Sequence, residues 1–262
     1  MKIDLILNIF YQPPEMLENY INNNTNLYIP INCGNLKGTN DWCDKHLHYE
    51  TNFKDNIAHL NPKLNEMTSI WCYWKNLMKS PDYVGHNHYR RLFRIEDLND
   101  IAEYDVIDAK PIPMMFNMSY FTGSPIPNFV STDIKNGYAI CHKIEDWNKM
   151  EELLKKTPYY VFFEDWKNQN SLSSPCNLFI MKKKMFEEYC NFVFPILFDL
   201  EQKINLEGRD GYQRRALAFI SERLTSLFIY SKKQQGYKHK TIGTMYFEDW
   251  KPQNSTDKRG QY

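Results

Sequence analysis

Asp82-Tyr-Val-Gly-His-Asn-His-Tyr-Arg-Arg91 joins a short apolar run to a cluster of two histidines, a tyrosine and two arginines. Residues 82–86 have the length and composition of a buried strand. In open α/β sheets, ligands bind beyond the carboxyl ends of the strands. We therefore expect residues 82–86 to form a strand of such a sheet, and the polar residues that follow to face a ligand.

Short apolar runs alternate with helical spacing on both sides of this stretch. Between Met67 and Met78, apolar residues recur three or four positions apart, which is typical of a helix packed on one face. The predicted strands cover residues 5–10, 27–31, 82–86, 104–107 and 177–181, and the predicted helices cover residues 13–21, 66–78, 144–154, 185–200 and 217–228. This alternation indicates an α/β fold, in which residues 32–54 and 110–128 are expected to be loops.

The length and the charge of the chain limit what it can be. Its 262 residues suit one α/β domain, which we place at residues 1–240, with a polar tail at 241–262 that is partly disordered or packed on the domain. Lys and Arg total 32, as do Asp and Glu, so the formal net charge is zero. A balanced chain has no general attraction for nucleic acid or anionic lipid. Any anion must therefore be held by a local cluster of basic groups.

The start of the chain and its cysteines indicate a cytoplasmic protein. The first ten residues are apolar but short and carry Asp4 and Asn8, so they predict a strand and not a signal peptide. No stretch approaches the ~20 apolar residues that span a bilayer. The six cysteines include no Cys-x-x-Cys pair and are expected to be free thiols. Cys43, His46 and His48 have metal-ligand chemistry, but their spacing matches no common zinc pattern.

Arg90 and Arg91 have the chemistry of a phosphate site, because guanidinium groups stay charged and offer forked donors. The chain has no Asp-x-Asp motif, with which many sugar-transferring enzymes hold a divalent metal, and Glu103-Tyr-Asp105 precedes its strand instead of following it. A leaving diphosphate must be stabilised by something cationic. We therefore favour neutralisation by the two arginines without a metal ion. The alternative is that they form ordinary surface ion pairs.

Residues 55–68 form a second polar cluster, which opens the helix predicted from residue 66. Free N–H groups at a helix start favour a phosphate or a polar ring nearby. Asn56 and Asn61 have amides that can hydrogen-bond a uracil or a ribose, and Glu66 and Thr68 occupy the first helical turn. Plain helix capping is the alternative, and for Asn65 it is the preferred interpretation.

Three segments, in order, resemble the bacterial capsular and exopolysaccharide glycosyltransferases that were once catalogued only as a domain of unknown function. The first runs from Asp55-Asn-Ile through Asn65-Glu-Met-Thr to Trp74-Lys-Asn. The second, Val84-Gly-His-Asn-His-Tyr-Arg-Arg-Leu-Phe93, is similar to the Gly-x-x-His-Tyr-Arg-Arg signature of that family. The third runs from Cys176-Asn-Leu-Phe-Ile-Met-Lys-Lys through Tyr212-Gln-Arg-Arg to Phe219-Ile-Ser-Glu-Arg-Leu224. Several matched segments in order are far more specific than one short motif.

This resemblance implies a GT-A-like, Rossmann-type nucleotide-sugar fold with a mixed central sheet. Members of the family are linked to galactofuranose transfer from UDP-galactofuranose. The chain departs from the family pattern at Asn177-Leu-Phe and at His86-Asn87, which bears on the identity of the sugar and not on the class. The UDP-sugar is then a substrate, and no cofactor is required. The expected donor-binding residues are Asn56, Asn61, Glu66, Thr68, His88, Tyr89, Arg90, Arg91, Asn177 and Arg215.

Inverting transfer needs a base that removes the proton of the acceptor hydroxyl. The candidates are His142, Glu164, Asp165 and Glu222. His142 matches a histidine of the family pattern and can accept a proton near neutral pH, but it also suits a capping or core position. Glu164 and Asp165 lie among aromatic residues, which stack on sugars or form core. Glu222 fits an ordinary helix ion pair with Arg215 equally well.

The sequence thus predicts a glycosyltransferase that moves a hexose, with galactofuranose favoured, from a UDP-sugar to a polysaccharide or a lipid-linked oligosaccharide. The alternative is a noncatalytic saccharide-binding or scaffold subunit of a capsule assembly complex. A phosphotransferase is disfavoured because no Gly-x-x-x-x-Gly-Lys loop is present. Lys182–Lys184 and residues 232–240 are basic enough for peripheral contact with the inner membrane, although a solvated basic face is the default interpretation.

Overall fold

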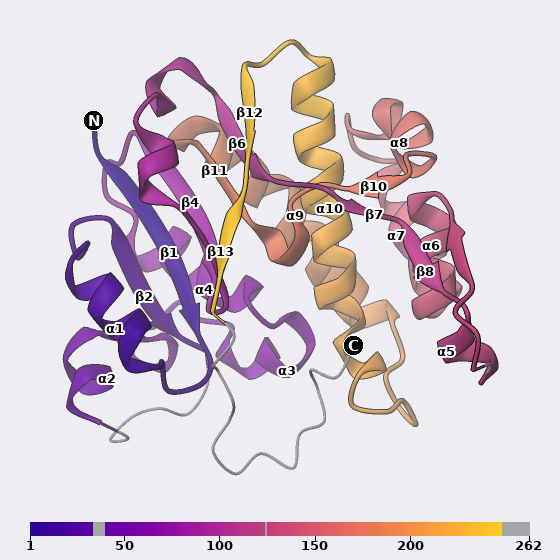
Figure 1. Ribbon diagram of the computed structural model, residues 1–262, viewed down its shortest axis with the longest axis horizontal. Helices are drawn as coiled ribbons and strands as arrows, with labels where there is room; N and C mark the ends of the chain where they lie inside the picture. Colours follow the sequence, from indigo (N-terminus) through magenta and orange to yellow (C-terminus); the bar gives the residue numbers. More distant parts are fainter. Residues whose placement is uncertain (34–39, 124, 248–262) are drawn as a thin grey trace.

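The computed structural model describes residues 1–33, 40–123 and 125–247, and these form a mixed sheet with helices on both faces (Figure 1). The strand order is β12-β6-β11-β4-β1-β2-β3, and β5 and β13 extend the sheet beside β4. The strands of this sheet are β1 (Ile3–Ile9), β2 (Tyr28–Asn32), β3 (His48–Tyr49), β4 (Tyr83–His88), β5 (Arg91–Phe93), β6 (Val106–Ala109), β11 (Phe179–Lys182), β12 (His239–Ile242) and β13 (Thr244–Tyr246). The predicted α/β fold with a mixed central sheet is confirmed.

The strand directions place one edge of the sheet where a ligand can bind. β1 pairs in parallel with both β2 and β4, and β2 pairs in parallel with β3. β11 is antiparallel to both of its neighbours, β4 and β6, which makes the sheet mixed. Because β1 and β4 are adjacent and parallel, their carboxyl ends meet at the same edge, the lower one in Figure 1.

The helices cover the two faces of the sheet unequally. They are α1 (Glu15–Asn22), α2 (Asp41–His46), α3 (Asn61–Leu64), α4 (Met67–Cys72), α5 (Ser119–Thr122), α6 (Ile134–Cys141), α7 (Ile144–Leu154), α8 (Tyr160–Lys167), α9 (Lys183–Lys203) and α10 (Ala216–Gln234). In β1, Leu5 and Leu7 join the core cluster that includes α1, whereas Ile6 joins the cluster built with α4, α9 and α10. This alternation is the period of two that a strand imposes on its side chains. Figure 1 shows α10 alongside the sheet, with α6, α7 and α8 beyond it.

The segments expected to be loops contain short elements. Residues 32–54 contain α2, β3 and the 3-10 turn η1 (Glu50–Asn52), and residues 110–128 contain β7 (Ile112–Pro113), β8 (Met115–Asn117) and α5. β7 pairs with β10 (Ser171–Leu172), and β8 pairs with β9 (Phe129–Ser131). The remaining turns are η2 (Ala58–Leu60), η4 (Ile95–Leu98), η5 (Ile101–Glu103), η6 (Pro175–Asn177) and η7 (Gln213–Arg215). Elements of two to six residues are too short for a clear periodic signal, which is why the sequence does not reveal them.

One predicted helix is divided, and the last described strands lie at the predicted end of the domain. The helix expected over residues 66–78 is α4 followed by the π-helical turn η3 (Tyr73–Leu77). At the predicted end of the domain, β12 pairs with β6 and β13 pairs with β5, so both strands pack onto the sheet. Residues 248–262 of the predicted tail lie outside the described residues. Within the described part of the chain, no helix combines the length and the apolar character needed to cross a bilayer.

Gly85 allows the three central strands to pack together. A Cβ atom at this position would lie 2.7 Å from Cδ2 of Leu5 and 2.8 Å from Cγ1 of Ile180. We expect Gly85→Ala to lower the free energy of unfolding by about 1–3 kcal/mol, because the neighbouring strands must move to admit the methyl group. Urea denaturation measures this change. Gly243→Ala is the matched control, since no heavy atom lies within 4 Å of the added Cβ. Equal stability of the two variants would contradict the packing argument.

Candidate active site

A cavity of about 600 Å³ opens at the edge of the sheet where β1 and β4 end. Seven of the predicted donor-binding residues line it: Asn61, Glu66, His88, Tyr89, Arg90, Arg91 and Arg215. Its wall also includes residues that were not predicted for the site: Asn8, Phe10, Tyr11, Cys33, Pro62, Asn65, Cys176, Tyr212 and Phe219. The polar cluster after β4 thus lines a cavity at the carboxyl edge of the sheet.

The β4–β5 hairpin presents the two arginines to the cavity. His88 pairs with Arg91 across the hairpin, so Tyr89 and Arg90 form its turn. Arg90 donates from Nη2 to the Tyr89 hydroxyl at 2.6 Å, and its guanidinium lies 4.9 Å from the centre of the Tyr89 ring. Arg91 donates from Nη1 to Sγ of Cys176 at 3.4 Å. The hairpin thus holds both guanidinium groups at the outlet of the strand.

The last described strand, β13, braces this hairpin from outside. It pairs with β5, and the backbone N–H of Phe247 donates to the carbonyl oxygen of Arg90 at 3.0 Å. The Tyr246 ring lies 5.1 Å from the Arg91 guanidinium. Cation–π contact of this kind orients a guanidinium without neutralising it. The arginines therefore keep their positive charge for an anionic ligand.

A third guanidinium, that of Arg215 in η7, enters from the opposite wall of the cavity. It lies 5.3 Å from the centre of the Phe219 ring. With its amide oxygen turned toward Arg215, Asn65 accepts hydrogen bonds from Nε and Nη2 at 2.7 and 2.6 Å. The interpretation of Asn65 as a helix N-cap was wrong. Its backbone has φ 48° and ends α3, and its side chain holds Arg215.

His88, which lines the cavity, is a neutral hydrogen-bond donor. Burial lowers its pKa well below the usual value, and the nearby positive charge of Arg91 lowers it further. Its Nδ1 accepts the backbone N–H of Arg90 at 3.3 Å. In a neutral imidazole the proton is then on Nε2, which leaves an N–H for a ligand oxygen. Asn8 lies beside His88, because the two residues are register partners in β1 and β4.

Two carboxylates complete the electrostatics of the site. Glu66 is 6% exposed and accepts a hydrogen bond from Nδ2 of Asn177 at 2.8 Å. Burial raises its pKa to about 7, and the charge of Glu222 contributes to the rise. Burial also raises the pKa of Glu222, against the opposing charges of Arg223 and Arg215. Glu222 does not line the cavity but stands next to it, where the backbone N–H of Cys176 donates to its carboxylate.

The turn before β11 supports the cavity from behind. Ser174, Cys176 and Asn177 all have φ of 54–55°, a left-handed conformation that non-glycine residues rarely adopt. Such backbone strain persists only where the surroundings hold it in place, and it concentrates at functional sites. The turn brings Cys176 to Arg91 and the Asn177 amide to Glu66. The left-handed residues could not be recognised in the sequence, because none of them is glycine.

Three predicted donor-binding residues do not reach the cavity. Asn177 is fully buried and acts on the cavity only through Glu66. Thr68 is also fully buried, and its hydroxyl donates to Oε1 of Glu50 at 2.8 Å. Asn56 caps its own turn: its Oδ1 accepts the N–H of Ala58, and its Nδ2 donates to the carbonyl of Phe53. Asn56 therefore holds its own loop, and the N-cap of the following turn η2 is Ile57.

Glu50, which accepts the hydrogen bond from the buried Thr68, allows a pH-dependent test of this contact. It is 3% exposed, and burial raises its pKa from 4.5 to about 7. Between these values the folded state binds more protons than the unfolded state, so stability is lost as the pH rises from 4.5 to 7. Gln at this position does not titrate, so Glu50→Gln escapes this loss. The free energy of unfolding of the variant minus that of wild type should be about 1–3 kcal/mol larger at pH 8 than at pH 5, since one pKa unit corresponds to 1.36 kcal/mol. Urea denaturation at both pH values measures this, and an unchanged difference would contradict it.

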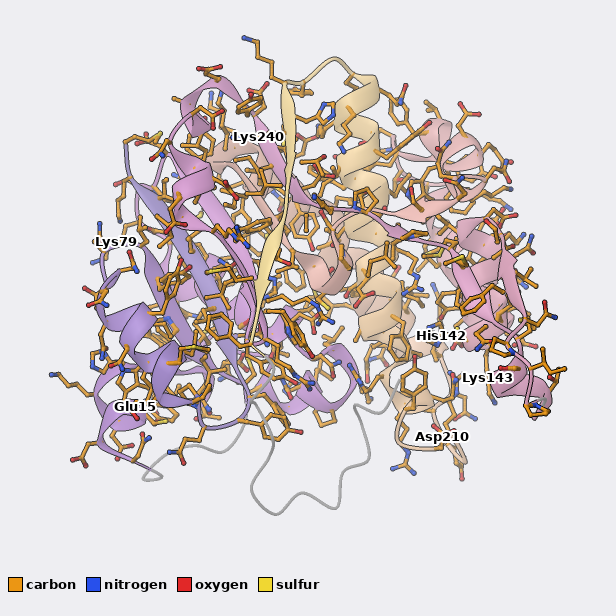
Figure 2. The ribbon with its side chains drawn as sticks, in the orientation of Figure 1. Glu15, Lys79, His142, Lys143, Asp210 and Lys240 are labelled. Atoms are coloured by element: carbon orange, nitrogen blue, oxygen red, sulfur yellow. The ribbon has the colours of Figure 1, made fainter. Side chains whose placement is uncertain are left out.

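The predicted bases His142, Glu164 and Asp165 do not line the cavity. The His142 ring stacks on Phe219 with centroids 4.0 Å apart, behind the cavity wall, and burial lowers its pKa to about 3. Figure 2 shows it beside Lys143, near the loop that carries Asp210. The alternative of a core histidine fits this position. Glu164 and Asp165 point outward from α8, where Glu164 pairs with Lys167 at 2.8 Å.

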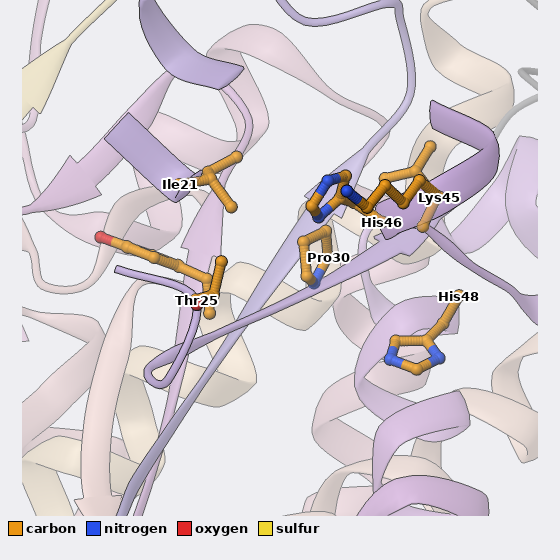
Figure 3. A pocket seen from close by; sticks show the side chains of 8 residues that line it. Ile21, Thr25, Pro30, Lys45, His46 and His48 are labelled. Carbon is orange, nitrogen blue, oxygen red and sulfur yellow. The ribbon is translucent and has the colours of Figure 1, made fainter. Parts of the chain in front are cut away.

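The residues considered for a zinc site do not converge. Cys43 is fully buried in the core, and the His46 ring stacks on Trp42. In a shallow pocket near α2, His46 lies with Lys45 beside Pro30, and His48 lies apart from them (Figure 3). Among residues 1–33, 40–123 and 125–247, no three His, Cys, Asp or Glu side chains are grouped so that they could hold a metal ion.

The basic stretches considered for membrane contact are largely paired with acids. Their ion pairs are Lys182–Asp105, Lys183–Glu187, Lys232–Glu188, Lys233–Asp108 and Lys240–Asp100. Lys240 lies at the opposite end of the sheet from the carboxyl ends of β1 and β4 (Figures 1 and 2). Neutralised lysines attract an anionic surface less than free ones do.

A family model described as "Domain of unknown function (DUF4422)" matches residues 17–234. The apo structure of the WbbM bifunctional glycosyltransferase is similar to this chain, with a TM-score of 0.70 and 18% sequence identity. The similarity covers 95% of this chain and 46% of that one, so the chain spans less than half the length of the solved protein. No curated protein matches the chain. The similarity confirms the predicted fold, an α/β fold of the glycosyltransferase type.

Proposed function

The chain belongs to the DUF4422 family, and from the chemistry of its cavity we propose that it is a glycosyltransferase that uses a nucleoside diphosphate sugar. The observation that carries this proposal is the convergence of Arg90, Arg91 and Arg215 on one cavity at the carboxyl edge of the sheet. Three guanidinium groups suit a diphosphate, because each offers forked donors and a permanent charge. The fold shared with WbbM, itself described as a glycosyltransferase, supports the same class.

The arginines would act mainly on the leaving group. When the bond between the sugar and the diphosphate breaks, negative charge develops on the phosphate oxygens. Preorganised cations at that position stabilise the transition state without needing to reorganise. We propose that Arg90, Arg91 and Arg215 supply this stabilisation in place of a divalent metal.

Aromatic and polar residues of the cavity suit the rest of a nucleotide sugar. Phe10, Tyr11, Tyr212 and Phe219 offer flat apolar faces for a base or a sugar ring. His88 offers an N–H donor, and Asn61, whose Nδ2 donates to Asn65 and Thr68, offers its amide oxygen as an acceptor for ribose or sugar hydroxyls. The choice of uridine, and of galactofuranose as the favoured hexose, rests on the likeness of the sequence segments. The inverting course and the acceptor, a polysaccharide or a lipid-linked oligosaccharide, are proposals on the same basis, as are the cytoplasmic location and the peripheral membrane contact.

Titration calorimetry tests the proposal without knowledge of the acceptor. We expect UDP and UDP-hexoses to bind in the micromolar range, and uridine to bind at least about tenfold more weakly, because it lacks the diphosphate that the arginines hold. The noncatalytic alternative predicts binding of oligosaccharides and no binding of nucleotides. Absence of binding for UDP, GDP and CDP sugars alike would contradict the proposed function.

A further inference from the structure

We infer that Glu66 is the general base of the transfer, taking the proton of the acceptor hydroxyl as its oxygen attacks the anomeric carbon. The inference rests on the proposed function. Glu66 was expected to bind the donor, and none of the residues predicted as bases lines the cavity. Among the described residues that line it, Glu66 is the one carboxylate.

The other titratable residues of the cavity are unsuited to the role. The unprotonated nitrogen of His88, Nδ1, already accepts the backbone N–H of Arg90, so it is not open to an acceptor hydroxyl. Burial raises the pKa of the Cys33 and Cys176 thiols, which therefore stay protonated. Burial likewise raises the pKa of the Tyr89 and Tyr212 hydroxyls. Arginine side chains stay protonated in proteins and cannot accept a proton.

Hydrogen bonds fix the Glu66 carboxylate at the cavity wall. Asn177 donates from Nδ2 to Oε1 of Glu66 at 2.8 Å. The Asn177 amide is itself held on both sides, because its Oδ1 accepts from Thr225 at 2.6 Å and its Nδ2 donates to Ser221 at 3.0 Å. A reactive group whose support is fully hydrogen-bonded keeps its geometry through the reaction. Asn177 is thus a positioning residue for Glu66.

Burial, with smaller effects from nearby charges, brings the pKa of Glu66 to about 7. Glu222 on α10 raises its pKa, Arg215 on η7 and the Asn177 amide lower it, and burial has the largest effect. Cys33, Cys176 and the Tyr189 hydroxyl also face it and stay neutral. A base is most effective when its pKa lies near the working pH. Glu222 is held instead by Arg223 at 3.4 Å and by the N–H of Cys176, outside the cavity.

The transfer step balances with these groups alone. The O–H proton of the acceptor moves to the Glu66 carboxylate, and the acceptor oxygen bonds to the anomeric carbon. The bond from that carbon to the diphosphate oxygen breaks, and its electron pair leaves with the diphosphate. Arg90, Arg91 and Arg215 stabilise that charge. The proton on Glu66 returns to water after the product leaves.

Two glutamine variants test the inference, with two separate readouts. One is the affinity for UDP, and the other is turnover, measured as the release of UDP from the UDP-sugar that the wild-type protein uses as donor. We expect Glu66→Gln to keep UDP affinity within about threefold and to lose about 10²–10⁴-fold in turnover, the range for general bases. Glu222→Gln is expected to keep turnover within about tenfold, because its carboxylate does not line the cavity. Turnover of Glu66→Gln within tenfold of wild type, or a large loss confined to Glu222→Gln, would overturn the inference.

The pH profile of the wild-type protein provides a test that needs no variant. Since the base works deprotonated, turnover is expected to rise with pH through about 7, the pKa of Glu66. Glu222→Gln should move this rise to lower pH, because it removes the negative charge that raises the Glu66 pKa. A flat profile from pH 5.5 to 8.5 would exclude Glu66 as the base. Failure to bind UDP at all would instead overturn the proposed function, so the two failures are distinguishable.

Discussion

Arg91→Ala is expected to weaken the binding of UDP by about 10–100-fold, and Arg90→Ala by a similar factor. Each arginine at the cavity can make hydrogen bonds to charged phosphate oxygens, which contribute about 1.5–3 kcal/mol apiece, and 1.4 kcal/mol corresponds to a tenfold change in affinity. The loss should be confined to diphosphate ligands. Uridine affinity should change little, because it presents no phosphate to the guanidinium groups. Calorimetry with UDP and uridine measures both effects.

Arg94→Ala is the matched control for this prediction. Arg94 follows β5 on the same segment, but it is exposed and does not line the cavity. Arg94 carries the same positive charge as Arg91 but lies outside the cavity. A general electrostatic effect of removing one positive charge would therefore appear in both variants. If Arg94→Ala weakened UDP binding as much as Arg91→Ala, the hairpin arginines would not be the diphosphate site.

The second large effect is expected at the ion pair between Asp146 and Arg209. Arg209 donates from Nη2 to Oδ1 of Asp146 at 2.9 Å and from Nη1 to Oδ2 at 2.5 Å. The two side chains are 1% and 6% exposed. Asp146→Ala leaves a buried guanidinium without its partner, and we expect the free energy of unfolding to fall by about 3–5 kcal/mol. Urea denaturation measures the fall.

This ion pair also anchors the loop that carries one wall of the cavity. Arg209 precedes Tyr212 and Arg215 in the loop, and Gln213 donates to the carbonyl of Cys141 at 2.8 Å. UDP affinity should therefore weaken in Asp146→Ala as well, as the loop loses its attachment to α7. Glu145→Ala, one residue away and exposed, should change neither quantity. A double variant that also removes Arg209 should be more stable than the sum of the single losses predicts, because no buried charge remains unpaired.

Those cavity-lining residues that lie together in short stretches of the sequence could be predicted from it. The apolar run of β4 and the basic residues after it are contiguous, and the rule that ligands bind at strand ends led to Arg90 and Arg91, which line the cavity. Glu66 and Asn61 were also found, because they belong to a polar loop that opens a helix. Arg215 was found only through the resemblance to known glycosyltransferases.

The other residues of the site depend on contacts between distant parts of the chain. Asn8 interrupts an apolar strand, and this signal of a functional position could have been recognised. Tyr212 and Phe219 meet Arg90 across more than a hundred residues, which periodicity cannot predict. The residues predicted as bases do not line the cavity, for a related reason. Glu66 resembles an ordinary helix-start residue in the sequence, and only its burial beside Asn177 gives it a pKa near 7.

The central claim is that guanidinium groups replace a metal ion in holding the diphosphate. Titration of the protein with UDP in EDTA, and again with excess Mn²⁺, tests it most directly. The account predicts dissociation constants that agree within about twofold, a difference of less than 0.5 kcal/mol. Binding that is undetectable in EDTA and restored by Mn²⁺ would contradict it.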